Sequence, residues 1–101
     1  MTPAATSLDD LVAKVRADAA QAWGLGTGAA LRVDATAVTW SDGGLGCPAP
    51  GQLYTQALVP GWRIVVSDGA RERSYHASQR GQWLWCPPGR AQAPLPGPAT
   101  R

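Results

Sequence analysis

Three side chains of this chain could form a site for nucleophilic catalysis: Asp42, Cys47 and His76. A cysteine nucleophile needs a neighbouring base, normally a histidine, and a third group that orients that base. His76 is the only histidine, so it is the only candidate for the base. Reactivity also requires a lowered thiol pKa, which no sequence pattern shows. A thiol enzyme that uses Cys47 is therefore kept as an alternative, and we predict that the protein is not an enzyme.

The two cysteines, Cys47 and Cys86, allow more than one interpretation. Each borders the end of a predicted strand, which favours a disulfide between them. A buried free thiol at Cys47 is the second interpretation, and a nucleophile is the third. With Asp42 and His76 the sulfurs could complete a zinc site, but the short paired spacing of such sites, as in C-x-x-C, is absent. We therefore predict no metal and no cofactor, and interpret His76 as a hairpin residue that is exposed or hydrogen-bonded.

The segment around Cys47 has the highest density of turn-forming residues in the chain, SDGGLGCPAPGQ at residues 41–52. Its Asp-Gly pair suits a turn, and its two prolines fix the backbone on either side of Ala49. Loops of about a dozen residues with such constraints are often functional. We predict that residues 41–52 form a rigid binding loop. The candidate binding residues in and around it are Asp42, Leu45, Cys47, Gln52, Tyr54 and His76.

A longer pattern extends from Trp40 to Ile64 and reads W-x-D-x-x-L-G-C-P-x-P-G-x-x-Y-x-Q-x-x-x-x-G-W-x-I. Together with the later Tyr-His pair and Cys86, it resembles a family of small uncharacterised bacterial proteins over roughly residues 8–86. That family supplies no established activity, so the resemblance implies a fold and a loop, not a reaction. Some similar proteins are exported, which would fit a Cys47–Cys86 disulfide.

Composition narrows the range of partners. The formal net charge is only +2 and the arginines are dispersed, so a nucleic-acid partner, which would need a basic patch, is not expected. No apolar run approaches the ~20 residues that span a bilayer. The expected partner is therefore a protein or a small ligand. Five tryptophans and no phenylalanine indicate either a tryptophan-based core or a tryptophan-rich binding surface.

The first ten residues, MTPAATSLDD, lack the basic and apolar regions of a signal peptide. The sequence as written therefore predicts a cytoplasmic protein. An exported form stays an alternative, because a disulfide persists in oxidising compartments.

The elements that must position the loop follow from periodicity and turn signals. After a short arm at residues 1–6, Ser7 is a typical N-cap, and apolar residues at helical spacing predict a helix over 7–23 that Gly24 ends. Alternation predicts strands at 30–40, 53–59, 62–67, 70–77 and 82–86. A change of apolar parity near Ala37 and Val38 predicts a β-bulge or a kink, and Pro60-Gly61 predicts a turn.

Asp68-Gly69 predicts a two-residue hairpin turn. The resulting strand pairs are Ser67 with Ala70, Trp62 with Tyr75, Ile64 with Arg73 and Val65 with Glu72.

We predict an α+β domain at residues 7–86, with one N-terminal helix packed on an antiparallel sheet of four to five strands, and a disordered Pro/Gly-rich tail at 87–101. The main functional prediction is a small non-enzymatic binding domain that presents loop 41–52. The alternative is a protease inhibitor that uses this loop or the 59–62 turn. The outline is similar to the cystatin helix-on-sheet, although the segment from Gln56 to Gly61 is one residue too long for the Q-x-V-x-G motif of that family.

Overall fold

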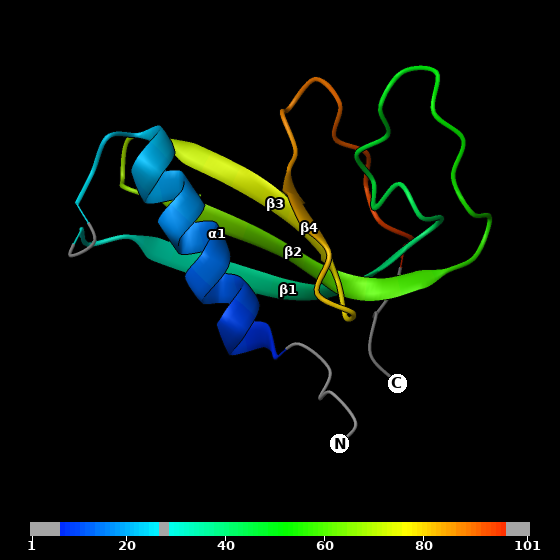
Figure 1. Cartoon of the computed structure of the whole chain (residues 1–101), viewed down its shortest axis with the longest axis horizontal. Helices are drawn as coiled ribbons and strands as arrows, with labels where there is room; N and C mark the ends of the chain where they lie inside the picture. The colour runs from blue at the N-terminus through cyan, green and yellow to red at the C-terminus, as the bar shows by residue number, and fades with distance from the viewer. Residues whose placement is uncertain (1–6, 27–28, 97–101) are drawn as a thin grey trace.

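The computed structural model describes residues 7–26 and 29–96. One helix lies across one face of a four-stranded antiparallel sheet, and the long loops gather at one end of that sheet (Figure 1). The strands follow the chain order β1-β2-β3-β4, so every neighbouring pair is sequential. The elements are α1 (Leu8–Ala22), β1 (Arg32–Trp40), β2 (Val59–Ser67), β3 (Glu72–Ser78) and β4 (Trp83–Trp85). The predicted α+β class is confirmed, with four strands.

Local signals at both ends of α1 act as predicted. The Ser7 hydroxyl accepts a hydrogen bond from the Asp10 backbone N–H at 3.1 Å, which satisfies one of the free donors at the helix start. At the other end Gly24 has φ +69, and the Leu25 N–H donates to the Ala20 carbonyl at 2.8 Å. This left-handed glycine followed by a six-to-one bond is the Schellman arrangement, which ends the helix.

The sheet buries apolar side chains on both faces, in two separate clusters. The helix face carries the larger cluster, built from α1, β2 and β3: Leu11, Val15, Ala19, Ile64, Val66, Tyr75 and Ala77. The opposite face carries a smaller one: Val38, Trp40 and Leu45, with Val59 and Leu84 packed against them. The second cluster is covered by the central loop and not by a helix.

This second cluster explains why the predicted β-bulge near Ala37 is wrong. β1 pairs with β2 without interruption from Arg32 opposite Ser67 to Trp40 opposite Val59. The apolar side chains change parity because the two halves of β1 are covered on opposite faces of the sheet. A β-bulge and a change in which face of the strand is covered both shift the apolar residues from one parity to the other.

The predicted strand at 53–59 and the predicted turn at Pro60-Gly61 are also wrong. Residues 53–58 contain no strand, and both Pro60 and Gly61 lie inside β2. The Pro60 carbonyl accepts a hydrogen bond from the Gln79 N–H at 3.0 Å, so the proline still contributes its acceptor. A Cβ at Gly61 would overlap the backbone of Ala77, so this glycine permits close strand contact and does not form a turn.

The β2–β3 hairpin is displaced from its predicted centre. The Asp68 N–H donates to the Arg71 carbonyl at 3.2 Å, and the Asp68 carboxylate accepts the backbone N–H groups of Ala70 and Arg71. The two central residues are therefore Gly69 and Ala70, and Asp68 closes the turn.

The displaced turn changes the neighbours across the hairpin but not the faces. The predicted pairs are replaced by Trp62 with Ala77, Ile64 with Tyr75, Val65 with Ser74 and Ser67 with Glu72. Side chains alternate with a period of two, so a two-residue shift keeps each one on its predicted face.

The chain beyond β4 makes contacts as far as Leu95. Residues 87–96 form neither helix nor strand, in agreement with their lack of periodicity. The Gln92 N–H donates to the Gly46 carbonyl at 2.8 Å, and the Leu95 N–H donates to the Thr39 carbonyl at 3.0 Å. The predicted arm at 1–6 and the end of the predicted tail, 97–101, lie outside the described residues.

Candidate functional site

His76, in β3, anchors the central loop, residues 41–52, to the sheet. Its ring stacks on the Trp40 ring with centroids 4.4 Å apart, and only 1% of the residue is exposed. Nδ1 lies 2.6 Å from the Leu45 carbonyl oxygen. Since a carbonyl oxygen can only accept, Nδ1 carries the proton and donates it. Burial lowers the pKa of His76, a shift that the hydrogen bond to Leu45 opposes and the Arg63 charge reinforces.

The loop bends sharply above this ring pair. Leu45 has φ +55 and is the one non-glycine residue with positive φ among those described, and Gly46 follows with φ +67. A Cβ at Gly46 would lie 2.5 Å from a Trp40 ring carbon and 2.9 Å from the Gln92 carbonyl oxygen. Gly46 adopts this conformation without strain, but a left-handed residue with a side chain, such as Leu45, is unfavourable unless its surroundings hold it. Here the burial of the Leu45 side chain and the hydrogen bond from His76 Nδ1 to the Leu45 backbone carbonyl hold this conformation.

A disulfide fixes the next residue of the loop. Cys47 and Cys86 are joined, with their Cα atoms 5.7 Å apart, and both are buried. The bond ties the loop to the end of β4, across 39 residues of sequence. The predicted disulfide is present, and in this form neither sulfur is a thiolate that could attack a substrate or bind a metal.

Arg90 closes the loop from the C-terminal side. Its guanidinium donates from Nη2 to the Cys47 carbonyl at 3.1 Å and from Nε to the Pro48 carbonyl at 3.3 Å. Sequence analysis missed this residue because it lies in a proline-rich stretch without periodicity. Its position four residues after Cys86 was the one available signal, since the disulfide brings that part of the chain to the loop.

Two other predicted binding residues also act within the loop. The Tyr54 hydroxyl accepts the Ala49 N–H at 2.9 Å, and the Asp42 carboxylate accepts the Gly44 N–H at 2.8 Å. The Gly43 N–H donates to the Thr55 carbonyl at 2.9 Å, which joins the two arms of the loop.

Each residue of the possible Cys–His–acid site therefore interacts with a group outside that site. Asp42 accepts from Gly44, Cys47 is bonded to Cys86, and His76 donates to the Leu45 carbonyl. Within residues 7–26 and 29–96, no group of three or more His, Cys, Asp or Glu side chains could hold a metal ion.

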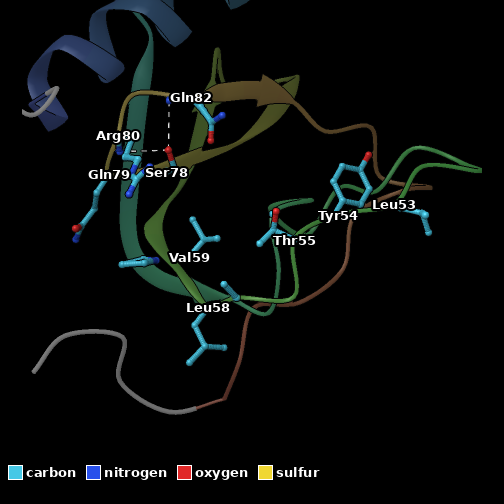
Figure 2. A pocket seen from close by; sticks show the side chains of 12 residues that line it. Leu53, Tyr54, Thr55, Leu58, Val59, Ser78, Gln79, Arg80 and Gln82 are labelled. Atoms are coloured by element: carbon cyan, nitrogen blue, oxygen red, sulfur yellow. Dashed lines mark hydrogen bonds between the residues drawn. The ribbon is translucent and has the colours of Figure 1, made fainter.

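An exposed segment follows the loop directly and includes most of the predicted strand at 53–59. We call residues 52–58 the exposed strap. Leu53 is 97% exposed and Leu58 is 64% exposed, and Gln52 is the one predicted loop-display residue that is also exposed. The strap forms one side of a groove of about 600 Å³, whose other side is the β3–β4 turn with Ser78, Gln79, Arg80 and Gln82 (Figure 2).

Comparison with known families assigns the domain. A family model described as Domain of unknown function (DUF8738) matches residues 12–86, which is most of the chain. This chain belongs to the DUF8738 family. No curated protein and no solved structure matches it significantly.

The DUF8738 match covers most of α1, all four strands and both cysteines. The Arg90 and Gln92 contacts that close the loop lie just beyond it. In the described part of this DUF8738 protein, no helix has the length and apolar character needed to cross a membrane.

Proposed function

We propose that this DUF8738 protein is a small non-enzymatic binding domain that presents the exposed strap, residues 52–58, to a protein partner. The observation that carries the proposal is the exposure of Leu53 and Leu58 on one short segment beside a groove. Single exposed leucines are common on protein surfaces, but two that flank the same groove form an apolar contact surface.

The rigidity of the surrounding loop supports this proposal. The disulfide, the His76 hydrogen bond and the two Arg90 hydrogen bonds hold the loop on the N-terminal side of the strap, and β2 begins directly after it. A segment already held in one shape loses less conformational entropy on binding, and therefore binds more tightly for the same contacts.

The disulfide also supports a location in an oxidising compartment, in preference to the cytoplasm predicted from the N-terminal residues. Disulfides between buried cysteines persist outside the cytosol, where glutathione and thioredoxin do not reduce them. Mass spectrometry of the native protein, alkylated with and without reduction, tests this part of the proposal. Two alkylated cysteines before reduction would contradict it.

Photo-crosslinking from the strap tests the binding function. A benzophenone amino acid at position 56, between the two leucines, should link to one discrete protein in extracts of the source cell. Leu53→Asp and Leu58→Asp should each reduce that link strongly, because a buried charge at the contact is costly. Leu95→Asp is the matched control, since Leu95 is also exposed but lies off the strap. Equal labelling by all four proteins would contradict the proposal.

A further inference from the structure

Hydrogen bonds fix the chain on both sides of the peptide bond between Leu53 and Tyr54. On its N-terminal side, the Gln52 N–H donates to the Ala49 carbonyl at 3.2 Å and closes a turn. On its C-terminal side, the Tyr54 hydroxyl and the Thr55 carbonyl both bind other parts of the loop. Leu53 itself is almost fully exposed.

The backbone around this bond lies outside regular secondary structure. Residues 52–56 form no turn, bend, helix or strand. A segment outside a helix or sheet can pair its remaining backbone groups with another protein while its side chains enter pockets. The Tyr54 hydroxyl accepts the Ala49 N–H, whereas Leu53 is 97% exposed, and the two side chains point in different directions (Figure 2).

The side-chain chemistry of residues 52–56 indicates which kind of pocket in a partner could accept the segment. No residue between Cys47 and Arg63 carries a charge. The one fully exposed large side chain there is an unbranched-β apolar residue, Leu53. Among endopeptidases, an apolar primary pocket accepts such a side chain, whereas a pocket with a carboxylate at its base accepts Lys or Arg.

We propose that residues 52–56 bind in the substrate cleft of a serine endopeptidase with an apolar primary pocket, with Leu53 filling that pocket and the chain remaining intact. This inference rests on the proposed binding function and names the class of partner. Both sides of the Leu53–Tyr54 bond are anchored, by the Cys47–Cys86 disulfide before it and by β2 after it. These fixed ends keep the Leu53 carbonyl and the Tyr54 amide close together even if the bond between them is cut. This favours the bound, intact loop over a released product.

A change of specificity tests the assignment of Leu53. The wild-type protein should inhibit chymotrypsin and subtilisin at micromolar concentration and should not inhibit trypsin. Leu53→Arg should weaken inhibition of chymotrypsin at least ~100-fold and should create inhibition of trypsin, because the introduced guanidinium fits the acidic primary pocket. Leu95→Arg is the matched control: it adds the same charge at an exposed leucine off the strap, and it should leave inhibition of chymotrypsin and the lack of trypsin inhibition unchanged.

Mass spectrometry of each mixture shows whether the chain stays intact. The proposal is overturned if neither chymotrypsin nor subtilisin is inhibited, if the chain is cut after Leu53 at the rate of an ordinary substrate, or if Leu53→Arg and Leu95→Arg have equal effects. A crosslinked partner that is not a protease would leave the binding function standing and remove this inference. Loss of self-association in Leu53→Arg but not in Leu95→Arg, measured by sedimentation, would instead assign the strap to a contact between copies of this chain.

Discussion

Trp40 is the centre of the second apolar cluster, and its truncation tests whether that cluster stabilises the fold. The side chain is fully buried, stacks on His76 at 4.4 Å, and donates from Nε1 to the Ala77 carbonyl at 3.0 Å. Truncation of a buried tryptophan to alanine costs about 3–5 kcal/mol. The lost indole hydrogen bond places Trp40→Ala at the upper end of that range, at about 5 kcal/mol.

A milder variant separates the hydrogen bond from the volume. Trp40→Phe keeps a ring above His76 but removes the Nε1 donor to Ala77, so it should cost about 1–3 kcal/mol. It also keeps the test possible if Trp40→Ala fails to fold, since the whole domain is worth only about 5–15 kcal/mol.

Urea unfolding followed by far-UV circular dichroism measures these costs. Trp85→Ala is the control, because Trp85 is 42% exposed and its clearest contact is the Arg73 guanidinium 4.1 Å above its ring. That variant should cost no more than about 2 kcal/mol. The reasoning is refuted if Trp40→Ala costs less than about 2 kcal/mol or no more than Trp85→Ala, since the loop would then not bury a second core.

Three further predictions concern the backbone, the disulfide and the histidine. Gly61→Ala should destabilise the domain by at least about 3 kcal/mol in urea unfolding, because its methyl group would overlap β3, whereas Gly89→Ala, which meets nothing within 4 Å, should change stability by less than about 0.5 kcal/mol. Reduction of the Cys47–Cys86 bond, which spans 39 residues, should lower the unfolding free energy by about 4 kcal/mol, and an unchanged value with and without reductant would contradict this. The single histidine signal in proton NMR should titrate with a pKa below that of the unfolded chain. His76 thus contributes stability that is present above pH ~6.5 and is lost as pH falls through the folded pKa, and a signal that titrates at the unfolded value would remove that contribution.

The fold class could be read from the sequence because its signals are local. Ser7 and Gly24 mark the ends of α1 through bonds to residues within five positions along the chain. The hairpin error had a local cause as well. Asp68 was placed at the centre of the turn, but its carboxylate bonds to the N–H groups of Ala70 and Arg71, which places it at the closing position.

The sequence indicated the constrained loop but not which of its side chains are exposed. Loop 41–52 is constrained as predicted, yet Leu45 and Cys47, expected to be displayed, are buried, and His76 lies beneath the loop. The predicted strand at 53–59 included Leu53 and Leu58, and within a sheet both would have packed against neighbouring residues. Their exposure follows from the start of β2 at Val59.

By itself, the sequence determined the helix and its caps, the regions of β1, β2, β3 and β4 in their order, and the presence of one constrained loop. These features depend on propensities and bonds within a few residues. Only the tertiary structure decided which face of β1 the loop covers, because Trp40 stacks on His76 and Cys47 bonds to Cys86, both far apart in the sequence. These long-range contacts turn Leu45 and Cys47 inward and leave Leu53 and Leu58 of the strap exposed.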